Sequence, residues 1–206
     1  MRQTARGKNR FLSVASRPVA GLVLFIVLLG APGPARTEPV DDARTIVERV
    51  RQRSFPELAG TDVRIGSIRS QDYFFRARFA LREYLFSPHM RYIIDVSSQP
   101  WTQNAPARGI EAIVAHELSH VVYYKSGPRI RLIGLIRLMS VGFTARFERQ
   151  TDAVAIARGF GPGLIEYRTW LYQQLTPAVA AKKKQIYMTP DEIQRALGSK
   201  LVSNQP

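Results

Sequence analysis

Two histidines, His116 and His120, lie four residues apart in the apolar stretch "AIVAHELSHVVYY", in a chain that contains only three histidines. Side chains four residues apart on a helix project from nearly the same side, so the two imidazoles can approach one point. The opposite side carries apolar residues at the spacing of a core-facing stripe, namely Ile110, Val114, Leu118 and Val121. The sequence therefore predicts a packed helix over 107–125 that presents two histidines in a fixed arrangement.

Three further acidic residues suggest how this helix would be completed as a metal site. Glu117 lies about 100° around the helix from His116, close enough to approach the same point without binding there. A catalytic zinc ion usually takes three protein ligands and leaves a fourth position for water. Glu148 and Asp152, again four residues apart, can supply what is missing. We expect Glu148 to bind the metal and Asp152 to accept the outer N–H of a ligand histidine; Asp152 as the ligand is the alternative.

The segment His116-Glu117-Leu118-Ser119-His120, followed by Glu148-Arg149-Gln150-Thr151-Asp152, resembles the HExxH plus ExxxD pattern of the gluzincin branch of zinc metallopeptidases. The shared motifs cover about ten residues, and the flanking strand and helices extend the match to 91–158. The resemblance implies a peptidase that binds one Zn²⁺ per chain through His116, His120 and Glu148. It also implies that Glu117 is the general base for a metal-activated water. Asp152 would then hydrogen-bond the outer nitrogen of a ligand histidine without binding the metal itself.

Other parts of the family pattern guide the remaining expectations. The longer metzincin pattern is excluded, because Tyr123 and Ser126 stand where it needs a glycine and a histidine. Gluzincins bind an extended peptide along a strand edge, and the resemblance places that edge on the strand expected at 91–97. Glu166 as a replacement ligand lacks a paired aspartate downstream. The residue that stabilises the oxyanion is not identified, although suitable donors occur at His89, Tyr167 and Tyr172.

The order of the expected elements predicts an α+β domain. Aromatic and β-branched residues separated by turn residues favour strands near 62–68, 73–80 and 91–97. Helical periodicity and Gly-Pro punctuation favour helices near 41–53, 107–125, 129–140, 143–158, 162–175 and 190–198. Strands followed by helices indicate a small antiparallel or mixed sheet, an active-site helix and a mostly helical C-terminal half. Together with the motif, this is a zincin-like fold.

The N-terminal 35 residues carry five basic residues, no acidic one, and an apolar run over 19–31. This pattern predicts a secretory signal peptide cleaved after Ala35, with an uncleaved membrane anchor or a buried helix as alternatives. Residues 36–206 are then a single metallopeptidase domain. The absence of cysteine favours the bacterial periplasm among exported locations.

The charge of the chain indicates anionic partners without selecting one. Five of the 30 basic residues precede the expected cleavage site, so 25 remain against 16 acidic residues, a net charge of +9. Such a surface is attracted to an anionic membrane or cell-wall polymer. The lysines at 182–184 are interpreted as a solvated turn or helix end, and no nucleic-acid motif accompanies them, so nucleic acid is not an expected partner.

Two interpretations remain open in the sequence. The apolar segment 128–143 is either a buried or semi-buried helix that joins the two metal-binding helices, or it is a lid or a membrane-surface element. The whole chain is either a peptidase or a catalytically inert, zinc-stabilised envelope protein that binds or chaperones other proteins. Glu117 favours the enzyme, because a zinc ion that only stabilises a fold does not need it.

Overall fold

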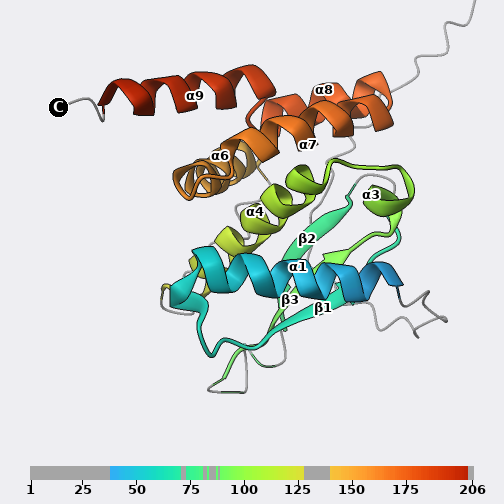
Figure 1. Ribbon diagram of the computed structural model, residues 1–206, viewed down its shortest axis with the longest axis vertical. Helices are drawn as coiled ribbons and strands as arrows, with labels where there is room; N and C mark the ends of the chain where they lie inside the picture. The colour runs from blue at the N-terminus through green and yellow to red at the C-terminus, as the bar shows by residue number, and fades with distance from the viewer. Residues whose placement is uncertain are drawn as a thin grey trace, which may run out of the picture.

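A computed structural model of the chain describes residues 38–70, 73–80, 89–127 and 140–203, together with Glu83 and Ser87 (Figure 1). The helices are α1 (Glu38–Ser54), η1 (Pro56–Leu58, a 3-10 helix), α3 (Gln99–Thr102), α4 (Ala107–Lys125), α6 (Val141–Ala157), α7 (Gly161–Gln174), α8 (Pro177–Ile186) and α9 (Pro190–Ser203). The strands are β1 (Val63–Ser67), β2 (Phe75–Phe79) and β3 (Tyr92–Val96). The signal peptide predicted at 1–35 and the helix predicted at 129–140 lie outside the described residues.

Most of the predicted elements are confirmed. All three strands form where they were expected, and α4 has the predicted bounds of 107–125. Helix α8 was not predicted; Thr176 caps its start by accepting a hydrogen bond from the Val179 N–H at 3.4 Å. The lysines at 182–184 lie at the end of α8, but the prediction that they are solvated is wrong for Lys183, which is 8% exposed.

None of the helices described here has both the length and the apolar character needed to cross a bilayer.

The three strands form a mixed sheet with the order β1-β3-β2. β1 is parallel to β3, and β2 is antiparallel to it. This arrangement confirms the α+β class and the small mixed sheet. It also shows that the prediction of β3 as a free edge was wrong, because β3 has a hydrogen-bonded neighbour on both sides. The nearly continuous apolar sequence of β3 is typical of a central strand, which is covered on both faces.

β2 is an edge strand of this sheet, and its outer edge faces α4. The Ser97 N–H donates to the Phe74 carbonyl, and the Ala80 N–H donates to the Arg91 carbonyl. In an antiparallel pair these bonds alternate along the strand, so the even-numbered residues of β2 bond to β3. Phe75, Ala77 and Phe79 therefore turn their backbone groups away from β3. Figure 1 shows β2 beside α4, with which it is in contact.

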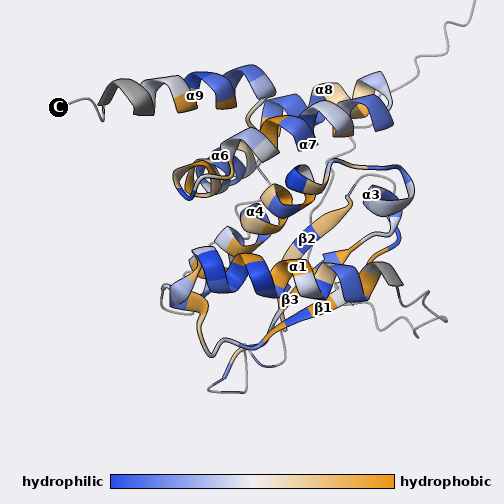
Figure 2. Ribbon diagram, viewed as in Figure 1, coloured by the Kyte–Doolittle hydropathy of each residue, from blue (hydrophilic) through white to orange (hydrophobic). Residues whose placement is uncertain are grey.

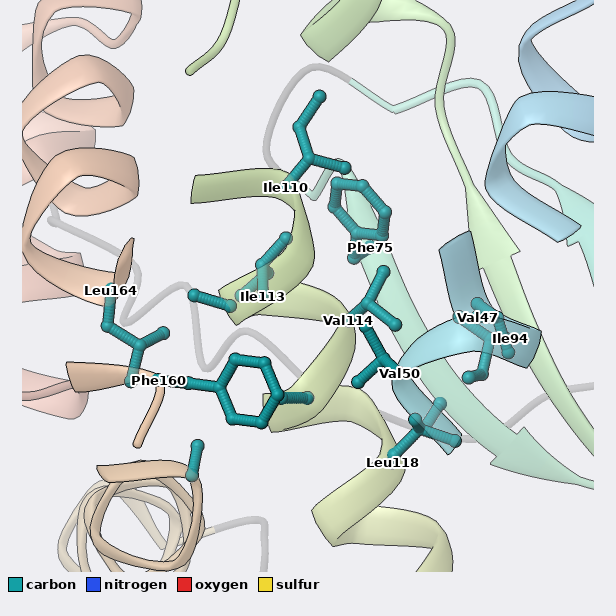
Figure 3. Close-up of a cluster of buried hydrophobic side chains, with 14 of the residues drawn as sticks. Val47, Val50, Phe75, Ile94, Ile110, Ile113, Val114, Leu118, Phe160 and Leu164 are labelled. Atoms are coloured by element: carbon teal, nitrogen blue, oxygen red, sulfur yellow. The ribbon is translucent and has the colours of Figure 1, made fainter. Parts of the chain in front are cut away.

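The core lies around α4, which is nearly surrounded by other elements. Figure 3 shows its apolar residues between Val50 of α1 on one side and Phe160 and Leu164, at the start of α7, on the other. The predicted stripe of Ile110, Val114, Leu118 and Val121 is buried throughout. Figure 2 shows that α1 alternates between hydrophilic and hydrophobic positions, as expected for a helix that covers this core on one face only.

Helices α4 and α7 pack unusually closely because glycines lie at their contact. A Cβ atom on Gly163 would lie 2.5 Å from the Arg108 carbonyl oxygen, and one on Gly109 would lie 3.1 Å from the Tyr167 nitrogen. Such distances leave no room for a side chain at Gly163. The close approach brings the buried face of α7 next to the helix that carries His116 and His120.

Candidate metal centre

Three side-chain atoms from two helices converge on one point. His116 and His120 project from α4, and Glu148 projects from α6. The Nε2 atoms of the two histidines are 3.2 Å apart, and each is 3.1 Å from Oε2 of Glu148. The histidines are 1% and 5% exposed, and the Glu148 side chain is 15% exposed. This buried group, which the sequence predicted, could hold a metal ion.

The spacing of these atoms fits a tetrahedral ion. An ion with bonds of about 2.0–2.1 Å separates neighbouring tetrahedral ligands by about 3.3 Å, close to the three distances observed. Two imidazole nitrogens and one carboxylate oxygen are also a common donor set for catalytic zinc. The same donors suit other divalent transition metals, so the geometry supports a metal site without identifying the metal.

Asp152 holds the outer nitrogen of His116. Its Oδ1 lies 2.8 Å from His116 Nδ1 and 3.1 Å from an Nη2 of Arg168, while its Oδ2 accepts the Met188 N–H at 2.9 Å. Asp152 is fully buried. Burial raises the pKa of this carboxyl, but the charges of Arg168 and His116 outweigh it and hold the pKa below its usual value. Asp152 is therefore an anion and an acceptor, as the sequence predicted, and it fixes the His116 ring.

The charges in the centre are strongly coupled. Burial alone would lower the pKa of His116, but the neighbouring carboxylates, above all Asp152, raise it to about 10. Burial would raise the pKa of Glu148, but His120 and His116 hold it well below its usual range. In the metal-free chain, His116 is thus a protonated imidazolium between Asp152 and Glu148, and a metal ion must displace the proton on Nε2.

His120 is held mainly by aromatic packing. Its ring lies 5.0 Å from the ring of Phe147 and stacks on Tyr124 at 6.0 Å. Its Nδ1 is 3.5 Å from Thr151 Oγ1, a long contact. The rotamer of His120 is therefore fixed chiefly by packing against two aromatic rings, whereas that of His116 is fixed by a hydrogen bond to a charged carboxylate.

Glu117 lies buried next to the three ligand atoms, with 5% of its surface exposed. Its Oε2 accepts the outward N–H of Ala77 on the edge strand β2, at 2.6 Å. Burial raises the pKa of Glu117; the imidazoles of His116 and His120 oppose the shift, and Glu148 adds to it. A carboxylate with a raised pKa takes up a proton more readily than one in water.

The other candidates from the sequence do not join this centre. Glu166 is partly exposed and pairs with Arg108 at 3.6 Å. Tyr167 packs against the rings of Phe75 and Trp170 in the core. Tyr172 has a buried hydroxyl that finds no hydrogen-bond partner within the described ranges. Neither Glu166 nor His89 belongs to the described group of potential ligands.

Three groups near the centre were missed by the sequence analysis. They are the guanidinium of Arg168, the ring of Tyr187, whose centroid is 6.0 Å from that of His116, and the backbone N–H of Met188. Arg168 could have been noticed, because it is a charged residue within the aromatic, apolar face of a predicted helix. A backbone N–H leaves no signal in a sequence.

Comparisons of the chain with protein-family models, with curated proteins and with solved structures found no match. We therefore infer its function from the chemistry of the site.

Proposed function

We propose that the chain is a zinc-dependent peptidase of gluzincin type that hydrolyses peptide or protein substrates. The observation that carries this proposal is the buried Glu117 carboxylate beside three converging ligand atoms. Structural zinc sites are usually closed by four protein ligands, whereas catalytic sites use three and keep a position open. Three ligands with a neighbouring base match the catalytic arrangement.

In this proposal His116, His120 and Glu148 hold the metal. A zinc ion bound there would supply Lewis-acid polarisation of the scissile carbonyl and would lower the pKa of a water ligand to about 7. Glu117 accepts a proton from the attacking water and delivers it to the leaving amine. The Ala77 N–H holds one oxygen of Glu117 in place, which leaves Oε1 to carry the proton. Asp152 keeps the proton of His116 on Nδ1, so that Nε2 faces the metal.

The outer edge of β2 is a suitable place for an extended substrate. Phe75 and Ala77 turn their backbone groups to the side of the sheet edge that faces α4, and the Ala77 N–H already donates to Glu117. A peptide that added along this edge would pair with main-chain groups immediately next to the general base. In this proposal β2 takes the substrate-binding role that the sequence analysis expected of β3.

We place the enzyme in the cell envelope, bound or close to an anionic membrane or cell-wall surface. The sequence of residues 1–35 and the net charge of the remainder support this location. The zincin-like fold is supported by the mixed sheet and by the position of the HExxH helix beside an edge strand.

The alternative is a zinc-stabilised binding or chaperone protein without catalysis. One observation favours it: the hydrogen bond from Ala77 to Glu117 ties β2 to α4, which gives this glutamate a structural purpose as well. The two functions make different predictions for a single substitution.

Glu117→Gln is expected to keep the bond to Ala77 and the zinc, because Gln still offers an oxygen acceptor, but to abolish peptide cleavage. Zinc content and digestion of a peptide library would be measured on wild type, Glu117→Gln and Glu148→Ala, the last of which should lose zinc. Cleavage by Glu117→Gln at the wild-type rate would refute the mechanism. A wild-type protein that binds zinc and cleaves nothing would favour the alternative.

A further inference from the structure

We infer that Arg168 is a positioning residue of the metal centre, which acts through Asp152 on the ligand His116. This inference rests on the metal binding proposed above, although it does not depend on peptide cleavage. Arg168 projects from α7, an element that supplies none of the proposed ligands. One of its Nη2–H groups donates to Oδ1 of Asp152 at 3.1 Å, and the same oxygen lies 2.8 Å from His116 Nδ1.

The burial of Arg168 calls for an explanation. Only 2% of its surface is exposed, and its Nε–H has no hydrogen-bond partner among the residues that the structure describes. A buried guanidinium with an unsatisfied donor is unfavourable, and an apolar residue of similar volume often stabilises a fold equally well. Within the described part of the chain, Asp152 is the only carboxylate that pairs with Arg168. The buried charge of Arg168 is therefore explained by its ion pair with Asp152.

Asp152 needs such a partner because it is enclosed completely. Its three donors come from three different places in the sequence, namely His116 Nδ1–H, the Arg168 guanidinium and the Met188 N–H. Arg168 donates to Oδ1 and the Met188 N–H donates to Oδ2, so the two donors together fix the plane of the carboxylate. The carboxylate then fixes the plane of the His116 ring, and with it the direction of Nε2.

Packing in turn fixes Arg168. Its guanidinium carbon lies 4.4 Å from the centre of the Tyr187 ring, in the connection between α8 and α9. The same ring lies 6.0 Å from that of His116. A cation over an aromatic face is attracted to it, so Tyr187 holds Arg168 against Asp152. The connection that also supplies the Met188 N–H thus supports the centre from the C-terminal end of the chain.

The test compares zinc affinity in Arg168→Met and Arg168→Lys, measured on the full chain by competition with a chelator of known affinity. Changes to groups that orient metal ligands typically cost about 10–100-fold in affinity, and we expect a loss in this range for Arg168→Met. Lysine keeps the charge and should recover part of the loss. The Co²⁺ form should show an altered visible spectrum in Arg168→Met.

Arg158→Met is a matched control. Arg158 also pairs with a carboxylate, that of Glu57, and lies over an aromatic ring, that of Phe55, at 4.2 Å. Its described partners, Ser54, Glu57 and Phe55, all lie outside the candidate metal centre. We expect this variant to lose stability while its zinc affinity stays within about threefold of wild type, a change below the range typical of groups that orient ligands.

A double-mutant cycle with Asp152→Asn tests whether Arg168 acts through Asp152. If it does, Arg168→Met or Arg168→Lys reduces zinc affinity far less in the Asp152→Asn background than in wild type. Additive losses, or wild-type affinity in Arg168→Met, would overturn the inference. If Arg168→Met does not fold, the Arg168→Lys arm of the cycle decides. A wild-type chain that binds no zinc would instead remove the proposed function itself.

Discussion

His116 uses both ring nitrogens, and its two contacts have opposite consequences. The contact of Nδ1 with Asp152 orients the ring towards the ligand position. The contact of Nε2 with Glu148 keeps a proton where a metal would bind. Asp152 thus prepares the ligand and, in the absence of metal, also raises its pKa. Metal binding at this centre is therefore a competition between a cation and a proton.

This competition predicts a pH dependence. The pKa of His116 is about 10 in the metal-free chain, so at neutral pH zinc must displace about one proton, and its affinity should rise about tenfold per pH unit below that pKa. Chelator competition between about pH 6 and pH 8 measures the slope. The slope should be smaller in Asp152→Asn, which lacks the main cause of the raised pKa. An affinity independent of pH would contradict the assignment of His116 as a ligand.

At the scale of elements, the contact between β2 and α4 links the sheet to the site chemistry. The N–H of Ala77 is not used by the sheet, because it points away from β3, and it reaches Glu117 instead. Proline is tolerated on edge strands where the N–H faces outward. Removal of the Ala77 N–H should therefore leave the hydrogen bonds between β2 and β3 intact.

Ala77→Pro is expected to lower the rate of peptide cleavage at least about tenfold with little change in zinc content, because it removes the donor that holds the general base, whose removal typically costs about 10²–10⁴-fold. Ala77→Gly keeps the N–H and serves as the control for the altered side chain. Rates and zinc content would be compared at equal folded fraction. Equal rates in the two variants would show that Ala77 does not position Glu117.

The elements also explain what could be predicted from the sequence. His116, Glu117 and His120 share a local helical spacing, as do Glu148 and Asp152, so their grouping follows from the chain itself. The nearly continuous apolar sequence of β3 favours a central strand, but which of the other two strands lies beside α4 depends on how three distant segments pair. Arg168 of α7 and Asp152 of α6 meet only when these two helices pack together. Such contacts arise from tertiary packing and have no local pattern.

At the scale of the whole molecule, the metal would join parts of the chain that are far apart in sequence. The proposed ligands belong to α4 and α6, and the groups behind them belong to α7 and to the connection between α8 and α9. An ion bound at the ligands would hold these helices together. Its removal should therefore affect the stability of the domain as well as its activity.

Removal of zinc by a chelator is expected to lower the unfolding temperature. Free zinc at about 1,000 times its dissociation constant stabilises a folded chain by about 4.1 kcal/mol, which corresponds to about 8–16 °C for a domain of this size. Differential scanning calorimetry with and without chelator measures the shift, and zinc should restore it. Glu148→Ala provides the control and should show little difference between the two conditions. A wild-type unfolding temperature unaffected by chelation would argue against a tightly bound ion.

The strand order β1-β3-β2 has a consequence for how the domain assembles. Within the described sheet, β1 and β2 share no ladder with each other, and both depend on β3, which follows them in the chain. The two earlier strands therefore stay unpaired until residues 92–96 arrive, and α4 begins only a short distance later. The sheet therefore cannot form without the segment that shortly precedes the histidine-bearing helix, and its pairings are non-local contacts, which form more slowly than local ones.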